Sequence, residues 1–365
     1  MSFEKVGFIG LGLIGGSIAK TIKKKYPDTT LIATARHADT IQEAHNFGTI
    51  ENDTLLPLSD FADCDYIFLC TPVQQNLIYL KELKSVIKPS CIITDVGSVK
   101  SDIHKAVTAL DMEANFIGGH PMCGSEKTGF FNATEYLLEN AYYIITPTAK
   151  TTPAQLEDFH ALVKSLGSVP MILDYEKHDF ATAAISHLPH IIASSLVNLV
   201  SDLDDEQETM RTIAAGGFKD ITRIASSSPV MWQNICLSNQ EQILKLTDCY
   251  IHALQNILSS VADAKSDDII SFFQSAKDYR DSITTPVRGS LQKNYSVYCD
   301  LVDEAGAIAT LATIMASHNI SIKNIGILHN REYEDGVLQI EFYEEDALEK
   351  AVKLMEDNHY VVHRR

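Results

Sequence analysis

The sequence predicts three consecutive domains: an α/β domain with a doubly wound sheet, an all-helical domain and a small α+β domain. Short apolar runs alternate with helical patterns through the first half of the chain, as in an open sheet covered by helices. The next stretch is helical almost throughout, and the last follows the order βαββαβ. We place these domains at residues 1–172, 173–291 and 293–365.

Short apolar or β-branched runs mark the strands expected after the N-terminal one in the first domain. These runs are 31–34, 66–70, 91–94, 115–117 and 142–145. Open α/β sheets bind ligands beyond the carboxyl ends of their strands. Two of the predicted strands end in turns suited to binding, Thr71-Pro72 and 95–100, so we expect cofactor and substrate to meet there.

Length and composition indicate a soluble multi-domain protein. The chain has 365 residues and a formal net charge of -18, which argues against binding to nucleic acid or to an anionic membrane. Glu4 stands where a secretory signal would be basic, and the seven cysteines form no C-x-x-C pair. We expect a cytoplasmic protein in which the uncharged but partly polar stretch 183–200 is a buried helix.

A glycine-rich turn near the N-terminus has the spacing of a dinucleotide-binding loop. The apolar run 6–9 leads to Gly10, Gly12 and Gly15, and a helix starts at about Ser17. We expect Gly10 to form the turn, Gly12 to let backbone approach a pyrophosphate, and Gly15 to pack helix on strand. The other cofactor-binding candidates in this loop are Leu11, Leu13 and Ile14. A Rossmann domain is therefore predicted, with a ligand-free glycine turn as the alternative.

The position that commonly selects the cofactor is unusual. Rossmann domains usually carry an acidic residue at the end of the second strand, where it binds the ribose hydroxyls. Here Arg36 and His37 follow the strand instead. Arg36 can accommodate a 2′-phosphate, so the sequence favours NADP; NAD is the alternative if Asp39 folds back toward the ribose.

A histidine in the stretch 118–129 is the candidate base. The run 115–117 is predicted to be a short buried strand, and glycines flank His120 on both sides. At the end of such a strand His120 would point into the ligand crevice. A neutral histidine with a pKa of about 6.5 can accept a proton, so turnover should fall as His120 becomes protonated.

A polar stripe is expected on the first helix of the second domain. Asp179, Ser186 and His190 are separated by seven and four residues, so they share one helical face. His187 and His190 also have a spacing that invites a metal. Because no third ligand completes such a site and Pro189 disturbs the turn, we expect no metal. A histidine satisfied within a helical core is the alternative for His190.

Two basic residues of the helical domain are candidates for anion binding. Lys219 and Arg223 lie four residues apart on one predicted helix face, behind a pair of glycines. A planar guanidinium can bind a carboxylate through two parallel hydrogen bonds. The alternative for Arg223 is a surface ion pair with Asp220. Trp232, the single tryptophan, is expected to pack at a helical interface.

Taken together, these motifs resemble those of the prephenate and arogenate dehydrogenases. The matching stretches are 10–17, 95–100, 119–124, 186–190 and 217–223. The resemblance spans about residues 4–290 and implies a Rossmann domain followed by a helical domain that builds a homodimer. It also implies NAD(P)-dependent oxidative decarboxylation of prephenate to 4-hydroxyphenylpyruvate in tyrosine biosynthesis.

The resemblance assigns a role to each candidate residue. It makes His120 the base, Ser98 the residue that hydrogen-bonds its imidazole, and Arg223 the binder of a substrate carboxylate. Thr71 and Pro72 would contact the cofactor. The other substrate-binding candidates are Ser186, His190, Lys219, Ser125 and Glu126.

The C-terminal domain resembles an ACT domain, a small module that senses amino acids. Asp303, Gly306 and Ile308 lie in its predicted strand-to-helix turn, where backbone amides can meet an amino-acid carboxylate. Ala305 stands where such turns usually have proline. We expect tyrosine, the pathway end product, to bind there and lower activity; a purely structural dimerising role is the alternative.

Three other functions stay open at this point. Arogenate differs from prephenate by an amino group in place of the side-chain keto group. A β-hydroxyacid dehydrogenase shares the glycine loop and a helical second domain, but it relies on a catalytic lysine. A non-catalytic amino-acid sensor would have kept the fold, and the presence of Ser98, His120 and Arg223 argues against it.

Overall fold

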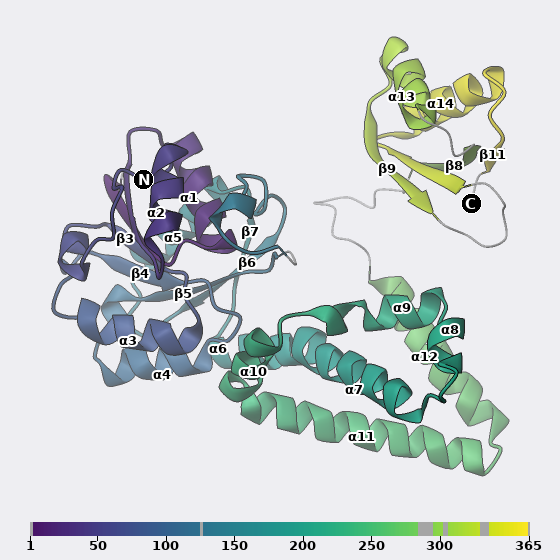
Figure 1. The fold of residues 1–365 in the computed structure, drawn as a ribbon, viewed down its shortest axis with the longest axis horizontal. Coiled ribbons are helices and arrows are strands. Elements are labelled where there is room, and N and C mark those ends of the chain that lie inside the picture. Colours follow the sequence, from purple (N-terminus) through teal and green to yellow (C-terminus); the bar gives the residue numbers. More distant parts are fainter. Residues whose placement is uncertain (1–2, 125–126, 284–294, 302–305, 329–335, 364–365) are drawn as a thin grey trace. The chain divides into compact units, whose positions relative to one another are not determined.

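The structure is a computed structural model that describes residues 3–124, 127–283, 295–301, 306–328 and 336–363 (Figure 1). Its contacts divide the chain into two compact units, Met1–Ile269 and Ile270–Arg365. The first unit contains the α/β region and most of the helical region, and the second contains the small sheet. The three predicted domain boundaries stay a prediction.

Four parallel strands form the first sheet. They are β1 (Lys5–Ile9), β2 (Thr30–Thr34), β3 (Tyr66–Leu69) and β4 (Ile92–Asp95). Their order in the sheet is β2-β1-β3-β4, so the winding direction reverses between β1 and β3. Ligands bind at such a reversal, beyond the carboxyl ends of the strands. The topology thus brings Gly10, after β1, next to Thr71, after β3.

A second sheet continues from β4 and carries the candidate base. It consists of β5 (Ile117–Pro121), β6 (Tyr142–Pro147) and β7 (Val169–Ile172), with β5 antiparallel to β6. A bridge between Ile93 and Phe116 links it to β4. The strand predicted at 115–117 begins at Ile117 and runs on through His120, so His120 lies within a strand and not after one.

The reason for this difference is close packing around Gly119. A Cβ atom there would lie 2.7 Å from the carbonyl oxygen of Asp95 and 2.8 Å from the hydroxyl of Tyr143. Glycine in this strand therefore reflects the close approach of neighbouring segments of the same chain, although consecutive glycines in a sequence are more typical of a turn.

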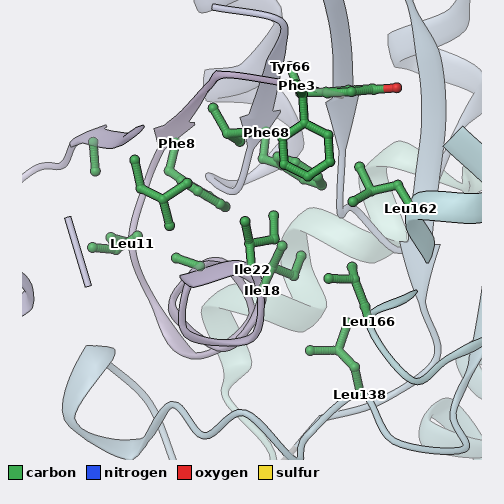
Figure 2. Packing of buried hydrophobic residues seen from close by; sticks show 14 of the residues in the cluster. Phe3, Phe8, Leu11, Ile18, Ile22, Tyr66, Phe68, Leu138, Leu162 and Leu166 are labelled. Carbon is green, nitrogen blue, oxygen red and sulfur yellow. The ribbon is translucent and has the colours of Figure 1, made fainter. Parts of the chain in front are cut away.

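Helices cover both faces of the first sheet (Figure 1). One face is covered by α1 (Leu13–Lys25), α2 (Ala38–Asn46) and α5 (Pro153–Ser165), and the other by α3 (Val73–Leu83) and α4 (Ser101–Ala109). Alternate strand residues enter the two cores, as the pleat requires. Phe8 and Phe68 face α1, where Ile18 and Ile22 pack beside them (Figure 2), whereas Ile9 joins the core under α3.

The region from Tyr175 onward is all helical. Its helices are α6 (Tyr175–Thr182), α7 (Leu188–Leu203), α8 (Thr209–Ile213), α9 (Gly216–Thr222), α10 (Pro229–Ser238), α11 (Gln240–Ala262) and α12 (Ser266–Ser282). A π-helical turn, Ala183–His187, joins α6 to α7, and a 3₁₀ turn, Arg223–Ser226, follows α9.

The stretch predicted to be a buried helix, 183–200, is mostly half-buried in the single chain. It belongs to the continuous helix Tyr175–Leu203, which by length and composition alone could cross a membrane, yet only 17% of its most apolar window is buried. Neighbouring helices are also apolar on the outside; Leu203, Leu244 and Leu258 are each more than 60% exposed. The expectation of burial was wrong because the single chain leaves these apolar faces uncovered.

The second unit contains a four-stranded antiparallel sheet. Its strands are β8 (Tyr295–Leu301), β9 (Ile322–Leu328), β10 (Gly336–Phe342) and β11 (Val362–His363), in the order β11-β8-β10-β9. Two helices, α13 (Ala307–Ser317) and α14 (Glu345–Asp357), pack on it around Leu311, Ile340 and Met355. The predicted order βαββαβ is confirmed.

Candidate active site

The turn after β1 is shaped by its glycines. Gly10 has φ +91°, a conformation that favours glycine, and a Cβ at Gly15 would lie 2.7 Å from the Gly10 carbonyl oxygen. At Gly12, the N-cap of the 13-residue helix α1, a Cβ would meet nothing within 4 Å, and no side chain caps the helix. Open amides at a helix N-terminus fit the phosphates of a dinucleotide.

The other residues of this loop differ in exposure. Leu11 is buried in the core, so its backbone alone can face a ligand, whereas Leu13 and Ile14 are half-buried. Arg36 is exposed between β2 and α2, with Asp39 in the first turn of α2. The chain therefore presents both a cation and a carboxylate where the adenosine ribose of a dinucleotide would lie.

A cavity of about 350 Å³ lies between the ends of β3 and β4 and helix α10. Thr71, Pro72 and Ser98 line it from the α/β region. The Thr71 hydroxyl donates a 2.5 Å hydrogen bond to Oδ1 of the buried Asn76, which fixes its orientation. The structure thus brings together Thr71, Pro72 and Ser98, which the sequence had placed in two separate turns.

His120 is held by a partner that the sequence did not indicate. Its Nδ1 lies 2.8 Å from Nε2 of His178, and Nδ1 of His178 lies 2.8 Å from Oδ1 of Asp179. Among the described residues no hydrogen bond joins Ser98 to the imidazole, and His178 is the partner of Nδ1 of His120. In the same part of the chain, Nε2 of His120 has no hydrogen-bond partner.

The surroundings of His120 favour its neutral form. Burial lowers the pKa of His120 well below 6.5, and His178, Lys100 and His187 lower it further. A buried imidazole loses hydration when it becomes charged, and nearby cations repel the added proton. The imidazole of His120 therefore stays unprotonated at neutral pH and can accept a proton.

A fully buried ion pair fixes the backbone next to His120. Nζ of Lys100 donates to the carboxylate of Asp95 and, at 2.7 Å, to the carbonyl oxygen of Gly119. Oδ1 of Asp95 accepts the N–H of Gly119 at 3.2 Å. Burial lowers the pKa of Lys100, and the Asp95 carboxylate opposes that shift. Both residues belong to the predicted turn 95–100, but nothing in the sequence indicates that a lysine just before a helix is buried.

Asp179 connects the helical region to the α/β region. Its carboxylate accepts the backbone N–H groups of Lys100 at 2.8 Å and Ser101 at 2.7 Å, where α4 begins. Burial raises the pKa of Asp179, but hydrogen bonds from His178, Ser101 and Lys100 outweigh this and hold the pKa below its usual value. The carboxylate is ionised and fully engaged.

The predicted common face of Asp179, Ser186 and His190 is interrupted. The π-helical turn Ala183–His187 lies between them, and its i to i+5 hydrogen bonding breaks the 3.6-residue repeat. Asp179 therefore points toward α4. Nδ1 of His190 donates to the carbonyl oxygen of Ser186 at 2.9 Å, so Ser186 meets His190 through its backbone.

His190 packs against the single tryptophan. Its ring stacks on Trp232 with 3.7 Å between centroids, and the indole Nε1 is buried with no partner among the described residues. His187, also beside Trp232, is buried, which lowers its pKa to about 4. Within the described ranges no group of three His, Cys, Asp or Glu side chains could hold a metal ion.

The basic candidates lie on elements next to His190. Helix α7, which carries His190, packs against α9 and the following 3₁₀ turn, where Lys219 and Arg223 are exposed. Ser125 and Glu126 lie outside the described residues, and so does Asp303 of the predicted regulatory turn. Gly306 caps α13 with φ +97°, and Ile308 in its first turn is 38% exposed.

Comparison with known proteins gives the chain a family. The family models for the nucleotide-binding domain and the dimerization domain of prephenate dehydrogenase match residues 18–172 and 174–275. Prephenate dehydrogenase from Bacillus subtilis is 38% identical over 349 residues, which cover 95% of this chain and 94% of that protein. The chain belongs to the prephenate dehydrogenase family.

Other members of the prephenate dehydrogenase family support the same assignment. Prephenate dehydrogenase from Lactococcus lactis is 34% identical over 97% of this chain and 98% of its own length. The crystal structure of prephenate dehydrogenase from A. aeolicus in complex with hydroxyphenyl propionate and NAD+ has a TM-score of 0.73 and 28% identity, covering 78% of this chain and 99% of that one. Synechocystis arogenate dehydrogenase has a TM-score of 0.70 and 31% identity, covering 77% and 100%.

Membership in the prephenate dehydrogenase family confirms the predicted resemblance and the Rossmann and helical architecture. It favours prephenate dehydrogenase over the β-hydroxyacid dehydrogenase and sensor alternatives, because prephenate dehydrogenases match nearly the whole chain. The protein is an oxidoreductase with a nicotinamide cofactor, and the glycine loop described above fits that cofactor.

Proposed function

We propose that this chain catalyses the NAD(P)-dependent oxidative decarboxylation of prephenate to 4-hydroxyphenylpyruvate. One observation carries the proposal: a half-buried neutral histidine, His120, is fixed through Nδ1 and has Nε2 unengaged by the described residues. The strand that carries it follows a dinucleotide loop in the same fold. Full-length relatives named prephenate dehydrogenase support the same reaction.

In the proposed reaction, His120 transfers the proton and the cofactor accepts the hydride. A bound nicotinamide supplies the acceptor for the hydride that leaves the hydroxyl-bearing ring carbon. Nε2 of His120 takes the hydroxyl proton as that hydride leaves. The bond between the ring and its carboxylate then breaks, carbon dioxide departs, and the bonding electrons complete the aromatic ring. His120 returns the proton to the phenolic oxygen, so no net proton is consumed.

Substrate binding is proposed to come mainly from the helical region. Arg223 binds a substrate carboxylate, with Lys219 as a second cation one helical turn away. His190, held by its stacking on Trp232, and Ser186 line the substrate side. Ser125 and Glu126 stay predicted substrate contacts near the entrance of the substrate pocket. Ser98 lines the cofactor side with Thr71 and Pro72.

The test is absorbance of the reduced nicotinamide with purified full-length enzyme. Prephenate and arogenate are each combined with NAD and NADP, with and without tyrosine. We expect reduction with prephenate that exceeds reduction with arogenate. If only arogenate supports reduction, the substrate is arogenate and not prephenate. If no combination supports reduction, the proposed function is refuted.

We propose that NADP is preferred because of Arg36, which is exposed where a 2′-phosphate would lie. A charge-assisted hydrogen bond contributes about 1.5–3 kcal/mol, so Arg36→Ala is expected to raise KM for NADP by about 10–100-fold. KM for NAD should change little. Lys150→Ala removes an equally exposed cation that pairs with Asp111, and it serves as the control. An unchanged NADP preference in Arg36→Ala would exclude this role.

We further propose that tyrosine binds the C-terminal unit and that the enzyme is a homodimer. Gly306, in the left-handed conformation, is the N-cap of α13, and backbone amides at a helix N-terminus can meet an amino-acid carboxylate. The exposed apolar residues of α7 and α11 support a subunit interface, since monomers rarely expose extended apolar faces. Inhibition in the tyrosine arms of the assay, and the mass of the enzyme in solution, test these two points.

We expect the acid limb of the pH profile to lie well below pH 6.5. Burial first, and then His178, Lys100 and His187, lower the pKa of His120. The active form is the neutral one, which is present above the pKa, so lowering the pKa extends activity toward acid pH. With prephenate, kcat/KM should stay level from pH 8 to below 6.5 and fall only at lower pH. This replaces the fall near 6.5 expected from an ordinary histidine.

Enzyme unfolding must be separated from this titration. Enzyme incubated at each pH and assayed after return to neutral pH shows whether the protein has survived. An inflection of kcat/KM at 6.5 or above, in enzyme that survives, would contradict the proposed environment of His120.

A further inference from the structure

We propose that His178 and Asp179 are positioning residues that hold His120 in the tautomer whose Nε2 is bare. The inference rests on the proposed function, since it concerns the base of that reaction. It extends the function by explaining why one particular nitrogen of His120 accepts the substrate proton.

Three side chains from two regions of the fold form a continuous series. His120 comes from β5, and His178 and Asp179 come from α6. The two contacts are both 2.8 Å long, and His178 and Asp179 are 1% and 0% exposed. Such side chains have no water to exchange with, so their hydrogen bonds are made within the protein.

The direction of the hydrogen bonds follows from Asp179. Its carboxylate already accepts the N–H groups of Lys100 and Ser101, and it can offer no proton to His178. Nδ1 of His178 must therefore donate to Asp179. In the neutral ring Nε2 then carries a lone pair and accepts from Nδ1–H of His120. His120 is left with Nε2 unprotonated.

The opposite arrangement would disable the base. A doubly protonated His178 would donate from both nitrogens, so Nδ1 of His120 would become the acceptor and its proton would move to Nε2. A protonated Nε2 cannot take the hydroxyl proton of the substrate.

The same series stabilises the protonated base during the reaction. When His120 takes up a proton, Nδ1–H donates more strongly to His178, which in turn donates to the Asp179 carboxylate. A histidine held from behind by an acidic group in this way keeps both its orientation and its tautomer. The groups that face the series are the Lys100–Asp95 ion pair from the α/β region and the titratable side chain of His187 from the π-helical turn.

Two variants of His178 separate positioning from mere packing. His178→Leu fills the space but offers no acceptor to His120, whereas His178→Gln retains an amide oxygen near the place of Nε2. We expect kcat with prephenate to fall about 100-fold in His178→Leu with KM changed less than about 3-fold, and most of the loss to be recovered in His178→Gln. The acid limb of the kcat/KM profile should also move in His178→Leu.

His104 provides the matched control. It is buried in α4, bonds to Thr146 at 2.9 Å and stacks on Tyr175 of α6, so it also connects the two regions. His104→Gln is expected to lower thermal stability without moving the pH profile. If folded His178→Leu keeps wild-type kcat and pH dependence, or loses activity only as far as its stability falls, the positioning role is refuted.

Nitrogen NMR reads the tautomer without any substrate. In full-length enzyme labelled with ¹⁵N-histidine, the His120 signals are identified as those lost in His120→Asn. A protonated Nδ1 and bare Nε2 on His120 support the inference, and a protonated Nε2 overturns it even in an enzyme active on prephenate. Failure of the wild type to oxidise prephenate, by contrast, overturns the proposed function and leaves this spectrum to decide the tautomer.

Discussion

Replacing His120 by Asn is expected to lower kcat with prephenate by about 1000-fold, because the reaction loses the group that takes the hydroxyl proton. The amide of Asn has nearly the size of imidazole and can still donate to Nε2 of His178. The buried contacts behind the base therefore survive. KM should change little, since carboxylate binding is assigned to Arg223. Steady-state kinetics at saturating cofactor measures both parameters.

Cofactor binding and folding serve as controls for this variant. Binding of the reduced nicotinamide, followed by fluorescence, should match the wild type, because the glycine loop lies on another strand. The thermal midpoint should fall only slightly. A kcat within about 10-fold of the wild type would show that another group takes the proton, since a positioned base contributes about 100-fold or more.

Replacing Lys100 by Met is expected to destabilise the protein by about 3–5 kcal/mol. The substitution leaves the Asp95 carboxylate buried without its countercharge, and Nζ is lost as a donor to Gly119. The double variant Lys100→Met with Asp95→Asn removes both charges and should recover a large part of the loss. Urea unfolding at one fixed protein concentration measures the difference, because a dimer's apparent stability depends on concentration.

Lys88 provides the control for this prediction. It pairs with Asp65 at 2.5 Å, but both side chains keep about a third of their surface in water. Lys88→Met should cost less than about 1 kcal/mol, as partly exposed ion pairs usually do. The prediction is contradicted if Lys88→Met and Lys100→Met lower the free energy of unfolding equally, or if the double variant is no more stable than Lys100→Met. Either result would show that burying the Asp95–Lys100 pair does not increase its contribution to stability.

The sequence predicted those structural features that depend on residues close together in the chain. Gly10, Gly12 and Gly15 act within one turn, and the apolar runs that become β1 to β4 are short and clearly bounded, so the α/β region and its ligand-binding edge were predictable. The order βαββαβ of the C-terminal unit was also predictable, because hydrophobic residues repeat with different spacings in strands and in helices.

The contacts around the base could not be predicted in the same way. His120 and His178 are 58 residues apart and belong to different regions of the fold, so no spacing relates them. The π-helical turn before Pro189 rotates Asp179 away from the face inferred for it, and a regular helical repeat contains no sign of such a turn. Ser98 was assigned to the imidazole through family resemblance, and the contact of His178 with Nδ1 of His120 was not foreseen.

The carboxylate of Asp179 has a consequence for protein engineering. It binds the start of α4 and the imidazole of His178 at once, so the α/β half supplies the base and the helical half supplies the groups behind it. A chimera that joins the α/β half of one relative to the helical half of another, cut near residue 173, would have to recreate this junction. Such exchanges should therefore succeed or fail on the pairing of 100, 120, 178 and 179, whatever the overall sequence identity of the two parents.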